Sequence, residues 1–309
     1  MGVVPASKTQ AGWKKRRSVR SIQESFVRLA CFLCAAASVV VTFGIIFVLS
    51  KETWVFFQRV SPVEYFTGTE WSPTIRPEKY GVLPLISGTL LITIGAGIIA
   101  VPLGLMAGVY LSEYASPRIR NFLKPGLELL AGIPTVVYGY FAVFFVTPLL
   151  RKFFDVEVFN AASGAIVVGI MILPLVSSLC EEALRAVPKS LREAAYGMGS
   201  TKLEVTLKVV LPAALSGVMA SFILALSRAI GETMAVTLAA GSTPRMTLNP
   251  AESIQTMTAF IVQISRGDTP AGTTPYYTLF AVALTLFVMT LAMNMAASML
   301  VKRFRQVYH

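Results

Sequence analysis

The stretch LISGTLLITIGAGIIAVPLGLMAGVYL, which runs from Leu85 to Leu111, contains no Asp, Glu, Lys or Arg. The hydrocarbon core of a bilayer is about 30 Å thick, and roughly 20 apolar residues in a helix cross it. Backbone N–H and C=O groups in lipid must bond within their own segment, so a stretch of this kind is expected to be helical. It predicts a transmembrane helix and places the chain among all-α integral membrane proteins.

The composition of the whole chain agrees with this class. Of its 309 residues, 55% are hydrophobic and only 14% are charged, whereas soluble domains carry about 25% charged residues. Five further stretches pass the same test of length and apolarity, so we expect a bundle of six transmembrane helices. The predicted spans are Val27–Leu49, Leu85–Leu111, Leu127–Leu150, Ala161–Leu179, Ala213–Ala240 and Tyr277–Val301.

The Lys and Arg residues predict the orientation of the bundle. Short cytoplasmic loops carry an excess of these residues. Here 18 of the 27 fall on the side of the two termini, eight fall on the other side, and Arg228 lies within a span. We therefore expect a basic cytoplasmic tail at residues 1–25, a permease-like membrane domain at residues 26–305, and both termini in the cytoplasm. Residues 51–84 and 243–275 are then expected on the outer side. The basic residues form no continuous face, which argues against a nucleic-acid partner.

The cytoplasmic loop between the fourth and fifth spans, about residues 180–211 (the 180–211 loop), shows helical patterning. Ser190 and Glu193 have the spacing of a capping box, and so do Thr201 and Glu204. The run Gly197-Met198-Gly199 separates the two boxes. The pattern predicts two short helices joined at a glycine turn, a compact shape that can insert into a groove of a soluble partner.

This loop is similar to the EAA loop of the binding-protein-dependent, type I ABC importer permeases. One position differs, because Val209 stands where that family has Ile. The resemblance implies the type I importer permease fold and a loop that docks into an ATP-binding subunit, while a Glu at position 193 that merely caps its helix is the alternative. The matching residues are Glu193, Ala194, Ala195, Gly199, Leu211 and Pro212.

Two charged residues, Arg228 and Glu232, lie near the middle of the predicted fifth span. Each such charge costs roughly 2.5–3.5 kcal/mol at the centre of a membrane helix. Residues four apart share one helix face, so we expect the two to pair. In one interpretation the pair only fixes helix packing. In the other, Arg228 lines an anion path, because a guanidinium fork suits phosphate oxygens, and Glu232 holds it in place. Binding along such a path must be weak enough for release.

The run from Leu226 to Val236, LSRAIGETMAV, resembles the corresponding segment of the phosphate ABC importer permeases of the PstC type. Tyr80–Leu90 and Ala131–Gly139 match as well, and the resemblance covers about residues 25–305. It implies inorganic phosphate as the solute. It also implies three kinds of partner: a second, PstA-like permease, two ATP-binding subunits and a periplasmic phosphate-binding protein.

The sequence also lacks several functional motifs. It contains no G-x-x-x-x-G-K-[ST] phosphate loop, so no ATP site is expected. Its only histidine is His309, and no metal cluster or nucleophile–His pair is evident, so we expect a transport subunit without cofactor rather than an enzyme. Permeases for other oxyanions, such as molybdate or sulfate, remain an alternative. An ion-coupled carrier is a more distant one, because no internal repeat is found.

Overall fold

The computed structural model describes the backbone of residues 10–304, and the side chains of residues 23–267, 269–299, 301 and 302 within it. Residues 1–9 of the predicted basic tail, and residues 305–309, lie outside the described residues. Nearly all elements are helical. They are α1 (Gln10–Phe57), α2 (Pro62–Thr67), β1 (Trp71–Ser72), β2 (Lys79–Tyr80), α3 (Leu83–Val109), α4 (Pro117–Ala131), α5 (Thr135–Phe141), α6 (Thr147–Arg151), α7 (Ala161–Arg185), α8 (Lys189–Gly197), α9 (Lys202–Val205), α10 (Leu211–Ala213), α11 (Leu215–Ile230), α12 (Met234–Ala240), α13 (Met257–Gln263) and α14 (Thr274–Phe304), with the π-helical turns η1 (Tyr110–Tyr114), η2 (Ala142–Val146), η3 (Thr206–Val210) and η4 (Ile264–Asp268).

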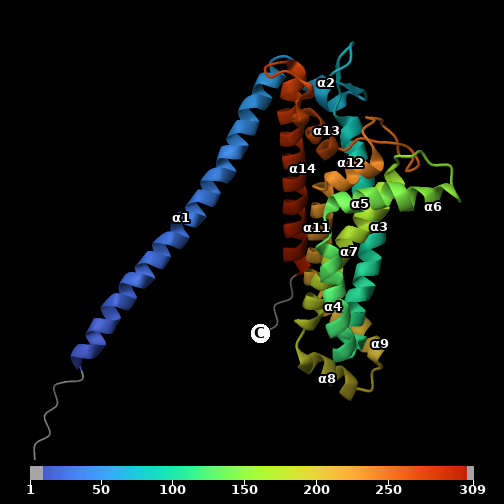
Figure 1. Ribbon diagram of the computed structural model, residues 1–309. Coiled ribbons are helices and arrows are strands. Elements are labelled where there is room, and N and C mark those ends of the chain that lie inside the picture. The colour runs from blue at the N-terminus through green and yellow to red at the C-terminus, as the bar shows by residue number, and fades with distance from the viewer. Residues whose placement is uncertain (1–9, 305–309) are drawn as a thin grey trace, which may run out of the picture. The chain divides into compact units, whose positions relative to one another are not determined.

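The expected class, an all-α membrane bundle, is confirmed. Four helices are long and apolar enough to cross a membrane, and six spans result if each of two bent helix pairs counts as one. The chain contacts divide the protein into two units at Lys51 and Glu52. The described residues of the first unit, from Gln10 onward, form a single helix, the blue part of α1 in Figure 1, and its side chains from residue 23 onward are exposed almost throughout.

The third predicted span, Leu127–Leu150, is not one straight helix. The chain turns by 88° between α4 and α5, at residues 132–134. Pro134 has no N–H to donate to a helix and disfavours the helical conformation of the residue before it. Tyr138 of α5 links the two helices across the break, because its hydroxyl donates a 2.8 Å hydrogen bond to the carbonyl oxygen of Leu130 on α4.

The fifth predicted span, Ala213–Ala240, is interrupted twice. The segment Lys202–Ala213 meets α11 at an angle of 71°, and α11 ends at Ile230. Residues 231–233 are not helical, and the chain resumes as the short helix α12. The expectation of a continuous helix through Arg228 and Glu232 is therefore wrong.

The second unit is built around the contact of α7 with α3 and α11 (Figure 1). Two glycines let α3 approach α7 closely. A Cβ atom on Gly104 would lie 2.6 Å from Cγ1 of Val176, and one on Gly108 would lie 2.7 Å from Cβ of Cys180. Small residues four apart commonly permit such packing between membrane helices.

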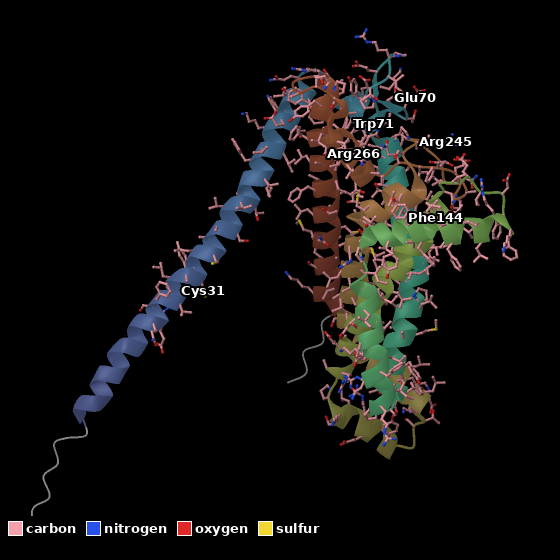
Figure 2. The ribbon with its side chains drawn as sticks, in the orientation of Figure 1. Cys31, Glu70, Trp71, Phe144, Arg245 and Arg266 are labelled. Atoms are coloured by element: carbon pink, nitrogen blue, oxygen red, sulfur yellow. The ribbon has the colours of Figure 1, made fainter. Side chains whose placement is uncertain are left out.

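The segment after α12 was expected to be an external loop, but part of it packs into the bundle. Ile254 and Met257 are fully buried, and the Met257 N–H donates a 3.1 Å bond to Oγ1 of Thr89 on α3. Phe260 of α13 packs edge-to-face on Trp71, which Figure 2 labels, with ring centroids 4.9 Å apart. Hydropathy could not predict this contact, because the residues are far apart in the sequence.

Candidate functional site

The 180–211 loop folds as two short helices with a glycine turn between them, as predicted. The second capping box is confirmed: the Glu204 N–H donates to Oγ1 of Thr201 at 3.4 Å, and the Thr201 N–H donates to Oε2 of Glu204 at 3.0 Å. Gly199 has φ +83°, a conformation that favours glycine. The turn thus requires a glycine at position 199, in agreement with the predicted glycine turn.

The prediction of the first capping box, formed by Ser190 and Glu193, is wrong. Helix α8 begins at Lys189, with Pro188 as its N-cap and without a side-chain cap. The fixed φ of proline suits a helix start, so the helix begins one residue earlier than expected. Ser190 then lies inside the first turn, where its hydroxyl is not placed to cap the helix.

The motif residues of the 180–211 loop differ in exposure. Glu193, Ala194, Gly199 and Pro212 are exposed, Leu211 is half-buried and Ala195 is buried. Large apolar side chains are exposed beside them. This group comprises Tyr196, Met198, Leu203 and Leu207, with exposed fractions of 43%, 81%, 58% and 53%. The loop therefore offers an apolar surface within the described chain, and exposed patches of this kind mark protein interaction sites.

Arg192 anchors the 180–211 loop to the bundle. Its Nη2 donates to Oε1 of Glu113 at 3.1 Å and to the Leu184 carbonyl oxygen at 2.7 Å, and its Nη1 donates to the Val187 carbonyl oxygen at 2.9 Å. The side chains of Arg192 and Glu113 are only 16% and 7% exposed. One guanidinium thus joins α8 to η1, which follows α3, and to the end of α7. The sequence analysis missed this role.

A second ionic cluster joins α4 to α7. The Glu181 carboxylate is 1% exposed, and its oxygens lie 2.8 Å from Nε of Arg120 and 3.1 Å from Nζ of Lys124. Arg185, one turn further along α7, lies 3.4 Å away. A buried carboxylate is tolerated only when it is paired in this way. The cluster fixes the first half of α4 to α7, and the sequence pattern did not predict it.

Small residues of α11 pack into the bundle. A Cβ atom on Gly217 would lie 2.6 Å from Cβ of Ala183, and Oγ of Ser221 lies 3.0 Å from Sγ of Cys180. Leu224 and Arg228, one helical turn apart, lie beside this face and are exposed. An exposed strip therefore adjoins the buried face of α11.

The two charged residues do not pair. Arg228 makes no hydrogen bond or ion pair with any residue that the structure describes. Glu232 is 9% exposed, and its Oε1 accepts a 3.1 Å bond from the N–H of Ala235, at the start of α12. Its carbonyl oxygen accepts a 2.8 Å bond from Oγ1 of Thr258. The predicted pairing is wrong because it assumed a helix that continues past Ile230.

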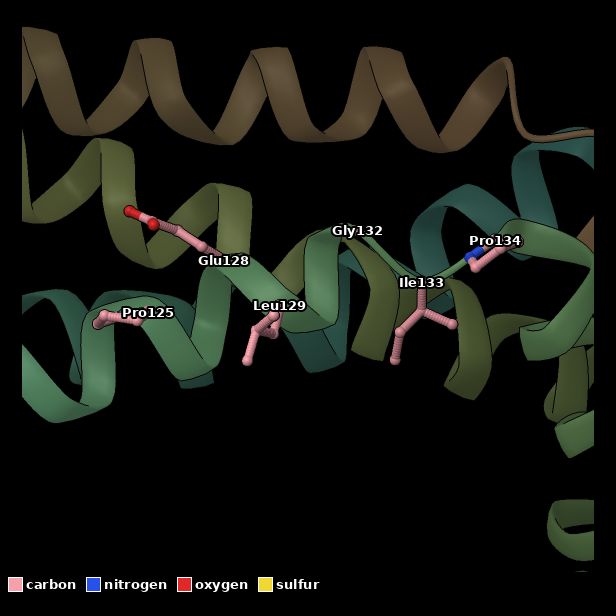
Figure 3. Close-up of a pocket in the computed structure, with 6 residues that line it drawn as sticks. All are labelled: Pro125, Glu128, Leu129, Gly132, Ile133 and Pro134. Atoms are coloured by element: carbon pink, nitrogen blue, oxygen red, sulfur yellow. The ribbon is translucent and has the colours of Figure 1, made fainter.

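A surface hollow lies at the break between α4 and α5 (Figure 3). Its lining is Pro125, Glu128, Leu129, Gly132, Ile133 and Pro134. The hollow is mostly apolar and contains neither Arg228 nor Glu232. Among the described residues, no group of three or more His, Cys, Asp or Glu side chains could hold a metal ion. Arg228 and Glu232 thus lie outside this hollow.

Comparison with known proteins places the chain in a family. The profile of the "Binding-protein-dependent transport system inner membrane component" matches residues 100–306. The probable ABC transporter permease protein YqgH of Bacillus subtilis is 35% identical over 280 residues, which are 90% of this chain and 89% of that protein. The phosphate transport system permease protein PstC of Mesorhizobium japonicum is 34% identical over 249 residues, 73% of this chain and 74% of that one.

Solved structures share the fold. A chain of the MetNI methionine ABC transporter in an inward-facing conformation aligns with a TM-score of 0.59 and 19% identity. The alignment covers 73% of this chain and 96% of the MetNI chain. At this level of identity the likeness concerns the fold alone.

Proposed function

Because the chain belongs to the family of binding-protein-dependent transport system inner membrane components, the permease subunits of ABC importers, we propose that the solute it conducts is inorganic phosphate. Permeases of this family work with ATP-binding subunits and a binding protein.

One observation carries the proposal: Arg228 is an exposed cation at the end of α11 whose donors are unused within the described chain. A guanidinium offers donors in a planar fork that fits the oxygens of a phosphate. An intramembrane cation that is not neutralised by a neighbour is a functional-site candidate by default. Relatives that bear the name phosphate transport system permease support phosphate over other anions.

We propose that different partners bind at the two ends of the bundle. We place this chain in a bacterial inner membrane beside a second, PstA-like permease, with both termini in the cytoplasm. The 180–211 loop, with its exposed apolar side chains, docks into one of two ATP-binding subunits. A periplasmic phosphate-binding protein delivers the solute to the opposite side, and ATP hydrolysis by the soluble subunits supplies the energy.

The choice between phosphate and another oxyanion is tested by uptake. A strain that lacks this chain is expected to lose uptake of labelled phosphate and to regain it with the wild-type gene. In proteoliposomes that hold the whole complex, excess unlabelled phosphate should abolish labelled uptake, and equal sulfate or molybdate should not. Equal competition by sulfate or molybdate would contradict the assignment to phosphate.

The anchoring role of Arg192 gives a second prediction. Arg192→Lys retains the positive charge but loses the fork that reaches three acceptors, so α8 should be held loosely. We expect the complex to assemble and hydrolyse ATP while the phosphate transported per ATP falls several-fold. The matched control is Lys208→Gln, which breaks an exposed pair with Glu204 and should change little, because exposed pairs contribute little. A normal transport ratio in Arg192→Lys would refute the anchoring role.

A further inference from the structure

The absence of a bond between Arg228 and Glu232 has a specific structural cause. Both side chains are long, and the residues lie four positions apart, so the two could meet if the backbone stayed helical. Instead the Glu232 carboxylate is directed to the N–H of Ala235, at 3.1 Å. The Glu232 N–H donates to the Ala229 carbonyl oxygen at 3.2 Å, which closes the last turn of α11. The position of the carboxylate therefore depends on the backbone of the break at residues 231–233, which includes the peptide that joins Glu232 to Thr233.

Thr258 holds that peptide in place from another element. Its hydroxyl donates to the Glu232 carbonyl oxygen at 2.8 Å, and the side chain is 5% exposed. A buried carbonyl in a helix break has no helical partner and is costly to leave unpaired. Thr258 supplies the partner that the helix no longer provides.

The position of Thr258 is itself fixed. The neighbouring Met257 is fully buried and its N–H donates to Oγ1 of Thr89 on α3, at 3.1 Å. The hydroxyl of Thr256, which lies 3.1 Å from that of Thr258, accepts a 3.2 Å bond from the Ala259 N–H and so caps α13. Thr258 therefore acts on the break from a segment bound to the core of the bundle.

We propose that Thr258 is a positioning residue that keeps Glu232 from neutralising Arg228 and so preserves an anion-binding cation in the transport path. The proposal rests on the function proposed above. If the Thr258 bond is lost, we expect the break at residues 231–233 to rearrange, so that the Glu232 carboxylate leaves the Ala235 N–H and pairs with the guanidinium. The carboxylate then competes with phosphate for the same donors.

The experiment measures the KM for phosphate in proteoliposomes that hold the complete complex. Thr258→Val keeps the shape but removes the donor, and KM is expected to rise about tenfold, the factor that a coupling of about 1.4 kcal/mol between two close charges produces. The maximal rate should change much less. Thr258→Ser, which retains the hydroxyl, should restore the wild-type KM. The matched control is Thr93→Val: Thr93 is also buried, but its hydroxyl bonds within α3, so its loss should leave KM unchanged.

A merely structural role for Thr258 is separated by a double substitution. Glu232→Gln retains an oxygen that can accept from Ala235 but carries no charge, so it cannot neutralise Arg228. In that background Thr258→Val should leave KM unchanged. An equal rise in both backgrounds, or no rise in either, would overturn the proposal. If Thr258→Val assembles poorly, Thr258→Ala is compared in the same two backgrounds, with the same expected and contrary results.

Failure of this inference is distinguishable from failure of the proposed function. If Arg228 is essential for phosphate uptake but Thr258→Val leaves KM unaltered, only the role of Thr258 is refuted. If uptake does not depend on Arg228 at all, the proposed function fails first.

Discussion

Phosphate uptake is expected to fall by about a hundredfold in Arg228→Gln, with the complex still assembled. A charged donor contributes roughly 1.5–3 kcal/mol to a hydrogen bond, and a bidentate fork makes two, so losing both costs at least a factor of about 100. Because Arg228 makes no bond within the described chain and is exposed, its removal leaves no buried partner unpaired. Assembly should therefore survive.

Two variants control this prediction. Arg228→Lys should retain partial uptake, because an ammonium keeps the charge without the planar fork. Arg266→Gln removes another exposed arginine, in η4 (Figure 2), that belongs to neither α11 nor the 180–211 loop, and should leave uptake unchanged. Normal uptake in Arg228→Gln would mean that this residue does not meet the solute.

The second large effect is expected at the glycine turn of the 180–211 loop. Gly199 has φ +83°, and a Cβ at this position would meet no atom within 4 Å. Any effect of Gly199→Val therefore arises from the backbone, since a β-branched residue at positive φ is strongly disfavoured. The turn between α8 and α9 should change, and with it the surface proposed to dock into the ATP-binding subunit. We expect phosphate-stimulated ATP hydrolysis to be lost in the reconstituted complex.

Gly197 provides the matched control for that variant. A Cβ there is also free of contacts, but the residue is helical and its φ is not positive. Gly197→Val should therefore retain most of the stimulated hydrolysis. An equal loss of stimulated hydrolysis in both variants would mean that added bulk at the docking surface causes the effect. Full stimulated hydrolysis in Gly199→Val would mean that the turn does not position the docking surface.

Hydropathy was sufficient to predict the class of fold and the approximate positions of the apolar segments, but not the breaks within the third and fifth spans. The length of the apolar runs depends only on bilayer thickness, so Leu85–Leu111 was recognisable without any knowledge of packing. The glycine turn at Gly199 and the capping box at Thr201 were predictable too, because both depend on residues close together in the sequence.

The breaks were harder to predict, because membrane helices tolerate Pro and Gly in many positions. Pro102, Pro125 and Pro174 lie inside helices, whereas Pro134 lies at an 88° bend. The presence of a proline therefore does not by itself predict a bend, because the neighbouring elements also decide whether the helix continues. At the second break, the Thr258 hydroxyl replaces the missing helical partner of Glu232.

The contacts that organise the candidate site join residues far apart in the sequence. Thr258 acts on Glu232, Arg192 on Glu113, and Arg120 and Lys124 on Glu181. A hydropathy pattern carries no information on such pairs. Arg228 could be identified from its position in the sequence, but the absence of an ion pair between Arg228 and Glu232 could not be predicted.

The most direct test of the central claim, that the exposed strip of α11 borders the phosphate route, uses Leu224→Cys in a chain whose Cys31, Cys34 and Cys180 are replaced by serine or alanine. Leu224 is 54% exposed and lies one turn before Arg228. A negatively charged, membrane-impermeant thiol reagent is applied to the assembled complex in proteoliposomes. We predict that the thiol reacts and that phosphate, but not equal sulfate, slows the reaction. A thiol that does not react, or a rate that phosphate leaves unchanged, would contradict the account.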